Sequence, residues 1–180
     1  MSILIDNLSV KELKLYKYVC ELGGAIEEKH EQLTSNGTYE KYREVHRNYF
    51  HLFLSTKNDV EKLEILKRLT FLNWYSFTEP SFFTGIEDLD KSIIFKSYSI
   101  LDDYLTTHKI DRELRFMLSH YSSFEWAILE FSEGKLNELT RFVKKSFHIP
   151  FETLNHKIIK EEMQNRGMMG IYWSSIIREN

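Results

Sequence analysis

The sequence predicts an all-α protein, a single irregular helical bundle of about seven to eight helices that forms one domain over residues 1–180. Apolar residues recur every three or four positions in one segment after another, which is the spacing of a helix face. The chain has only 7 glycines and 2 prolines, the residues that interrupt helices. Alternation of period two, the mark of a half-buried strand, is not found over any useful length.

The first predicted helix covers residues 10–33. Ser9 and Glu12 have the spacing of a capping box at its start, and Asn36 followed by Gly37 ends it. Two adjacent glycines in its middle destabilise it by roughly 1 kcal/mol each relative to alanine. We therefore expect another helix to approach closely at that point.

The second and third predicted helices begin at capping residues. Thr38 caps the second, which carries an apolar stripe along one side, and Asn58 with Glu61 forms a capping box for the third, which runs to about Phe77. The second half of the third helix is almost entirely apolar, so we expect it to turn inward. Its early turns carry charged residues that we assign to a solvated face: Glu61, Lys62, Glu64, Lys67 and Arg68.

Further helices follow Pro80, which ends the third helix. We expect a bend near Ser122 in one of them, and the apolar spacing predicts their ranges as 86–108, 111–129, 136–143, 154–163 and 168–177. Three carboxylates crowd the first turn predicted for residues 86–108, where the helix dipole favours negative charge; they are Glu87, Asp88 and Asp90.

Composition and charge exclude several classes of protein. The net charge is −3, and basic residues are scattered among carboxylates, so the sequence shows no footprint for nucleic acid or an anionic membrane. No apolar run approaches the roughly 18 residues of a membrane span, and the first ten residues do not resemble a signal peptide. A lone cysteine, Cys20, fits a reducing compartment. We expect a cytoplasmic protein.

The chain carries no strong signature of metal or nucleophilic chemistry. Glu27 and His30 make the single Glu-x-x-His spacing, whereas a di-iron site needs two, and His46 and His51 point about 140° apart on one helix. We interpret Cys20 as a core residue, because its predicted helix places it among apolar neighbours. The sequence contains no Gly-x-Ser-x-Gly nucleophile elbow, no glycine-rich phosphate-binding loop and no dinucleotide-binding fingerprint. We therefore expect no metal and no cofactor.

An aromatic segment around Pro80 provides the best candidate site. Six rings fall within the first thirteen residues of FLNWYSFTEPSFFTGIEDLD, residues 71–90. Such crowding is typical of a core, and it also occurs at interfaces, where large rigid side chains supply most of the binding energy. The candidate binding residues are Trp74, Tyr75, Glu79, Phe82, Phe83 and His120.

Two functions fit these observations. The first, which we favour, is a non-enzymatic cytoplasmic protein-interaction module: a regulator, adaptor or immunity-type inhibitor that binds another protein. The second is a helical-bundle enzyme or sensor with a ligand pocket near residues 74–83, possibly metal-assisted. In that hypothesis Glu79, partly desolvated among aromatic rings, and His120 act as acid and base.

Overall fold

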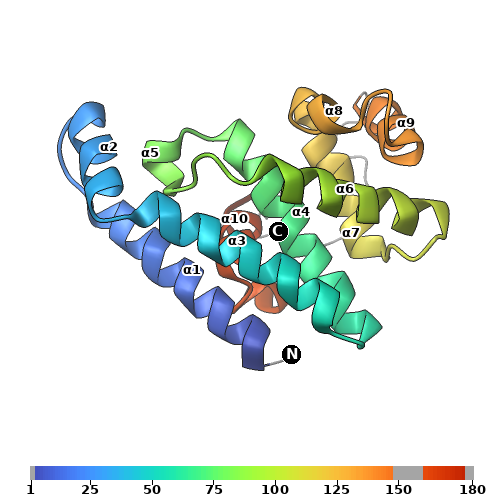
Figure 1. Ribbon diagram of the computed structural model, residues 1–180, viewed down its shortest axis with the longest axis horizontal. Helices are drawn as coiled ribbons and strands as arrows, with labels where there is room; N and C mark the ends of the chain where they lie inside the picture. The colour runs from blue at the N-terminus through green and yellow to red at the C-terminus, as the bar shows by residue number, and fades with distance from the viewer. Residues whose placement is uncertain (1–2, 148–159, 177–180) are drawn as a thin grey trace. The chain divides into compact units, whose positions relative to one another are not determined.

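The computed structural model describes residues 3–147 and 160–176, and all regular secondary structure in these residues is helical (Figure 1). The predicted all-α fold is confirmed. The described residues contain ten α-helices instead of seven to eight: α1 (Ile3–Glu21), α2 (Ile26–Ser35), α3 (Thr38–Ser55), α4 (Asp59–Thr78), α5 (Ser81–Thr84), α6 (Lys91–Thr106), α7 (Arg112–Tyr121), α8 (Trp126–Ser132), α9 (Asn137–Ser146) and α10 (Gly167–Ile176). Two short 3-10 segments are η1 (Ser122–Phe124) and η3 (Lys160–Met163).

The helices divide into two compact units. The first unit combines the described residues up to Lys91 with the C-terminal segment from residue 160 onward, and the second unit begins at Ser92 and includes α7, α8 and α9. In the first unit, α3 packs along both α1 and α4, and α10 packs on α1 (Figure 1). Helices α1 and α10 therefore pack in the same core, although they are far apart in the sequence.

The predicted helix over residues 10–33 is wrong in its start and in its continuity. It begins at Ile3, and Ser9 lies within α1, where its hydroxyl donates to the Ile5 carbonyl at 2.9 Å. The chain then breaks after Glu21, because Gly24 takes a left-handed conformation with φ +99° that only glycine adopts readily. No helix crosses closely at the glycine pair, since a Cβ on Gly23 would meet nothing within 4 Å.

Helices α3 and α4 start where the sequence predicts, but the predicted Thr38 cap is wrong, because the N-cap of α3 is Gly37 and Thr38 is the first helical residue. Gly37 lies in the left-handed region with φ +71°, directly before α3. The Asn58 side chain caps α4 by accepting from the backbone N–H groups of Val60 and Glu61 at 3.0 and 3.3 Å. Residues 65–74 of α4 are all buried, which confirms the inward turn for residues 69–74, whereas residues 75–77 at the end of the apolar run are only half-buried. Lys67 and Arg68 are buried with them, so the solvated face assigned to these two residues is wrong.

The connection from α4 to α6 differs from the prediction. After Pro80 the chain makes the single short helix α5, which ends at Gly85, and a Cβ at Gly85 would lie 2.8–3.0 Å from Val19, Thr38 and Tyr42. Helix α6 begins at residue 91, not 86, because Asp88 adopts a left-handed φ of +48°. The three carboxylates therefore precede the helix and do not occupy its first turn.

The second unit follows the predicted pattern. The Asp111 carboxylate caps α7 by accepting from the Leu114 N–H at 2.7 Å, and the expected bend at Ser122 is the 3-10 segment between α7 and α8. The Leu139 N–H donates to the Asp102 carboxylate at 2.7 Å and so joins α9 to α6.

The C-terminal predictions are tested in part. Residues 148–159 lie outside the described part of the chain, and the end of the predicted helix 154–163 is the 3-10 segment η3. The predicted helix over residues 168–177 is confirmed as α10. Among the described helices, none is both long enough and apolar enough to cross a bilayer.

Candidate functional site

The first half of the aromatic segment is core. Trp74 is 1% exposed, and the rings of Phe71, Trp74 and Tyr75 on α4 meet Tyr172 on α10 at centroid distances of 5.5, 5.4 and 5.6 Å. Phe71 and Tyr75 stack at 4.8 Å. Burial raises the pKa of Tyr75, and the nearby charge of Glu79 adds to the effect. This ring cluster joins α4 to the C-terminal helix.

The second half of the segment turns outward at α5. The rings of Phe82 and Phe83 lie 4.5 Å apart. Phe82 is half-buried and packs on a cluster formed by Val19, Leu33 and Tyr39, whereas Phe83 is 57% exposed. The half-buried ring of Phe82 thus packs against the exposed ring of Phe83. We call Phe82 and Phe83 the phenyl pair.

The carboxylate of Glu79 is not desolvated as expected. Glu79 is the exposed residue that ends α4, and its backbone N–H donates to the Tyr75 carbonyl at 3.2 Å. The charge of Glu79 is close enough to Tyr75 and Tyr172 to add to the rise in their pKa values, yet Glu79 itself is exposed. Solvent therefore reaches Glu79.

A polar cluster lies beside the phenyl pair. The Ser81 hydroxyl donates to Glu87 at 3.0 Å, and His30 Nδ1 lies 3.0 Å from the Tyr39 hydroxyl and 3.9 Å from Glu87. Burial raises the pKa of Tyr39. The histidine of the Glu-x-x-His spacing thus hydrogen-bonds to Tyr39 and lies near the Glu87 carboxylate. No group of three or more metal-ligating side chains occurs among residues 3–147 and 160–176.

A pocket of about 330 Å³ opens at the same turn. Hydroxyls, carboxylates, one ammonium group and apolar side chains line it: Ser76, Phe77, Ser81, Ile86, Glu87, Asp88, Leu89 and Lys91. The pocket shares Ser81 and Glu87 with the polar cluster. It lies where the sequence places a ligand pocket in the second hypothesis, although its lining residues differ from the predicted binding residues.

His120, the remaining candidate, belongs to α7 in the second unit. It is half-buried, and burial lowers its pKa to about 4. Its imidazole is therefore neutral at physiological pH. Pairing of His120 with Glu79 as acid and base stays a prediction.

Burial of His46 predicts a loss of stability in acid. Burial on α3 lowers the pKa of His46 to about 4, although its Nε2 lies 2.8 Å from the Asn73 side-chain oxygen. The unfolded chain, with an ordinary histidine pKa near 6.5, binds the proton more tightly than the native state. Stability present above pH 6.5 is thus lost as the pH falls toward 4, by about 3 kcal/mol. Chemical denaturation at a series of pH values should show this loss. His46→Gln should remove the share due to His46 and leave the contribution of His120, whose pKa is also lowered to about 4; a pH dependence identical to that of the wild type would contradict the assignment.

A buried polar cluster in the first unit was not identified from the sequence. Glu12, on α1, is buried, and its carboxylate accepts from the Tyr49 hydroxyl and, at 2.9 Å, from the Met168 N–H. Arg68, 1% exposed, donates to the hydroxyls of Tyr49, at 3.1 Å, and Ser9. Burial raises the pKa of the Glu12 carboxyl. The positive charge of Arg68 and the hydrogen bonds from Tyr49 and Met168 act in the opposite direction and limit this rise.

A second carboxylate extends this cluster to the C-terminal segment. Glu64 accepts from Arg68 Nε at 2.9 Å and from Arg166 Nε at 2.9 Å, and Arg166 also makes a second bond to it through Nη2. We call these side chains the buried ion cluster; they are Ser9, Glu12, Tyr49, Glu64, Arg68 and Arg166. With two carboxylates and two guanidinium groups it is formally neutral. It joins α1, α3 and α4 to the segment that precedes α10.

Two sequence signals point to the buried ion cluster in retrospect. Glu12 occupies the inward stripe of α1 together with Ile5, Leu8 and Val19, all of which are buried. Arg68 interrupts the buried run of α4. A charged residue at an inward helix position requires a partner, whereas the Ser9 and Glu12 spacing was assigned to a helix cap.

The lone cysteine is also placed differently. Cys20 is exposed near the end of α1, so the interpretation of Cys20 as a core residue is wrong.

Comparison of the chain with protein-family models, with curated proteins and with solved structures finds no match.

Proposed function

We propose that the protein is a non-enzymatic interaction module of the cytoplasm that binds another protein, as a regulator, adaptor or immunity-type inhibitor, through the turn between α4 and α6. The phenyl pair carries this proposal. Phe83 presents more than half of its surface to solvent while Phe82 holds it in place from beneath. A rigid exposed aromatic loses little conformational entropy on binding, which is why such residues dominate interface energetics.

Charges around the phenyl pair indicate the kind of surface it fits. Glu79 and Asp88 are exposed and Glu87 is half-buried, so the turn is acidic. Complementary surfaces place opposite charges at the rim of an apolar contact. The expected partner therefore has an apolar pocket bordered by lysine or arginine.

Removal of the exposed ring tests the proposal. Tagged wild-type protein should retain a stoichiometric partner from native lysate, and Phe83→Ala should weaken its binding at least about tenfold, as for an interface hot spot. Val60→Ala is the matched control, since Val60 is exposed near the opposite end of α4, about 27 Å along the helix from Thr78. Equal capture by both variants, or no stoichiometric partner at any salt concentration, would contradict the proposal.

The pocket of about 330 Å³ supports the second candidate function, a sensor or enzyme for a small polar molecule. Its hydroxyl, carboxylate and ammonium groups converge around apolar walls, as in many ligand sites. A small molecule that stabilises both the wild type and Phe83→Ala against heat would favour this function over the first. Loss of that stabilisation in Glu79→Gln would support the proposed acid and base, and its persistence would count against them.

A further inference from the structure

One exposed face of α1 carries residues at alternating spacings of three and four. In this face Ile3 is 78% and Val10 49% exposed, and Lys17 and Cys20 are also exposed. Asp6 and Leu13, which are half-buried, complete the pattern. We call these six residues the α1 seam: Ile3, Asp6, Val10, Leu13, Lys17 and Cys20. The same spacing places the a and d residues of paired helices along one line. The opposite face of α1 is buried in the first unit.

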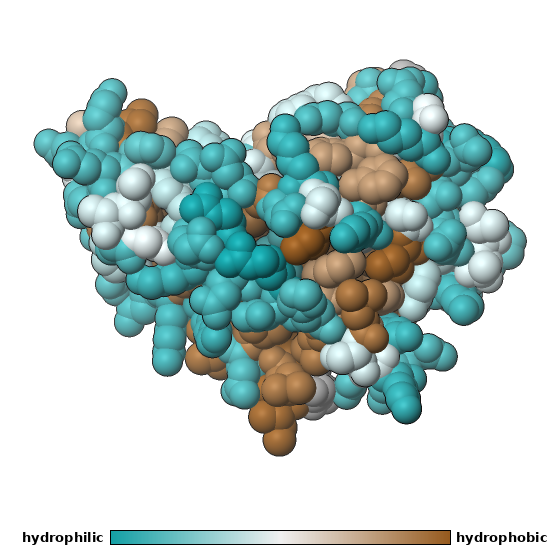
Figure 2. Space-filling model, in the orientation of Figure 1, coloured by the Kyte–Doolittle hydropathy of each residue, from teal (hydrophilic) through white to brown (hydrophobic). Residues whose placement is uncertain are grey.

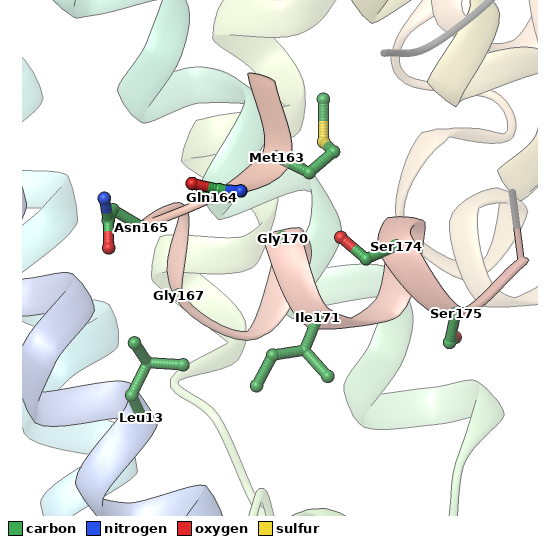
Figure 3. Close-up of a pocket in the computed structure, with 9 residues that line it drawn as sticks. All are labelled: Leu13, Met163, Gln164, Asn165, Gly167, Gly170, Ile171, Ser174 and Ser175. Atoms are coloured by element: carbon green, nitrogen blue, oxygen red, sulfur yellow. The ribbon is translucent and has the colours of Figure 1, made fainter. Parts of the chain in front are cut away.

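A groove runs beside the α1 seam. Two adjoining hollows of about 340 and 610 Å³ share Leu13, Gln164 and Asn165, so they follow α1 as one groove. Figure 3 shows Leu13 across from the start of α10 at Gly167, with Ile171 one turn further along. Apolar surface is also exposed at the lower edge in Figure 2, beside the N-terminal end of α1. Val10 and Leu13 of the seam thus line a surface hollow beside the start of α10.

We propose that the α1 seam binds the α1 seam of a second copy of this chain in antiparallel orientation. In one register Val10 lies against the partner's Leu13, Asp6 against the partner's Lys17, and Ile3 against the partner's Cys20. Each contact occurs twice because the interface is isologous. Two apolar layers lie at the centre, and an opposite-charge pair flanks them on each side.

Charge selects this orientation. A parallel pair in register places Asp6 against Asp6 and Lys17 against Lys17, and like charges at facing positions disfavour association. Lys17 is available for the new contact, because its pair with Glu21 at 3.8 Å is exposed on both sides and such pairs contribute little.

Apolar pairing selects the same register. A shift by one heptad toward the N-terminus places Val10 against the partner's Asp6, and a shift the other way places Leu13 against the partner's Lys17. Either shift separates the apolar layers and leaves charges facing apolar side chains, which costs desolvation. The complementary charges and the apolar contacts thus agree on a single arrangement. This surface is separate from the phenyl pair, so the inference does not depend on the proposed function.

Charge reversal tests the arrangement. Analytical ultracentrifugation over a range of concentrations should show a dimer of the wild type. Asp6→Lys and Lys17→Asp should each weaken dimerisation at least about tenfold, since each turns two attractive contacts into two repulsive ones. An equimolar mixture of the two variants should dimerise again, because every facing pair is then opposite in charge. Lys57→Asp, which changes an exposed lysine elsewhere in the first unit, is the charge-matched control.

Cross-linking tests the register independently. Ile3→Cys should form a covalent dimer with native Cys20 under mild oxidation. An internal disulfide is impossible, because the two positions are seventeen residue steps apart along α1, about 25 Å. Leu4→Cys, turned about 100° around the helix, should cross-link far less. A monomeric wild type, equal cross-linking by both cysteine variants, dimers that resist charge reversal, or no recovery in the mixture would each overturn the proposal.

Discussion

Arg68→Met should lower the free energy of unfolding by about 3–5 kcal/mol, the usual cost of removing one partner of a buried ion pair. Methionine preserves most of the side-chain volume, so the loss reports charge and hydrogen bonding. Without Arg68 the Glu12 carboxylate keeps its bonds from Tyr49 and Met168 but loses its nearest cation, and one bond to Glu64 is lost as well. Urea denaturation followed by circular dichroism measures the effect.

The pH dependence of this loss has a definite sign. Burial already raises the pKa of Glu12 above its ordinary value of 4.5, and Arg68 opposes that rise. In Arg68→Met the pKa of Glu12 should rise further, so the native state binds a proton that the unfolded chain releases. The deficit relative to wild type should thus be largest well above pH 4.5 and should shrink as the pH falls toward it.

A surface pair provides the control. Arg43 donates to Glu40 at 2.8 Å on the outer side of α3, and solvent screens this pair, so it contributes little to stability. Arg43→Met should accordingly change stability little at any pH. A comparable loss in both variants would show that the buried ion cluster contributes nothing special. In the double variant Glu12→Gln/Arg68→Met, part of the loss should be recovered, because the uncompensated buried charge is gone.

Gly167→Ala should destabilise the fold by about 3 kcal/mol or more, as the sum of a left-handed backbone penalty and a steric conflict. Gly167 has φ +60°, and a Cβ there would lie 2.7 Å from the carboxylate of Glu12. That carboxylate cannot move aside freely, because Tyr49 and Met168 hold both of its oxygens. Thermal or urea unfolding measures the loss.

Gly37→Ala separates the two contributions. Gly37 has φ +71°, close to that of Gly167, but a Cβ at this position meets nothing within 4 Å. Its replacement should therefore cost only the backbone penalty, about 1–2 kcal/mol. Equal losses in the two variants would mean that the contact of Gly167 with Glu12 adds nothing to the stability of the C-terminal segment.

Local signals predicted the helices whose ends carry strong capping chemistry. Asn58 and Asp111 accept from backbone N–H groups at the starts of α4 and α7, as their sequence context predicts. Prediction failed where the backbone takes a left-handed turn. Gly24 ends the first helix early, and Asp88 delays the start of α6. The spacing of apolar residues carries no information about the backbone angle φ. The sequence therefore predicts helices that continue through both turns.

The candidate site was predicted only in outline. Local sequence identified the aromatic segment. It could not separate Trp74, which the ring of Tyr172 covers from nearly a hundred residues away, from Phe83, which stays more than half exposed. The α1 seam was missed for a related reason. Residues 10–33 were assigned to one helix with Cys20 inside, whereas α1 starts at Ile3 and leaves Cys20 exposed.

By itself the sequence determined that this chain is all-α, where most of its helices lie, and that a ring-rich segment ends one of them. These properties follow from interactions between residues a few positions apart. Only the tertiary structure decided which charges are buried and which rings are exposed. Glu12, Glu64, Arg68 and Arg166 meet across as many as 102 positions of sequence, and such contacts depend on how helices pack, which apolar spacing does not encode.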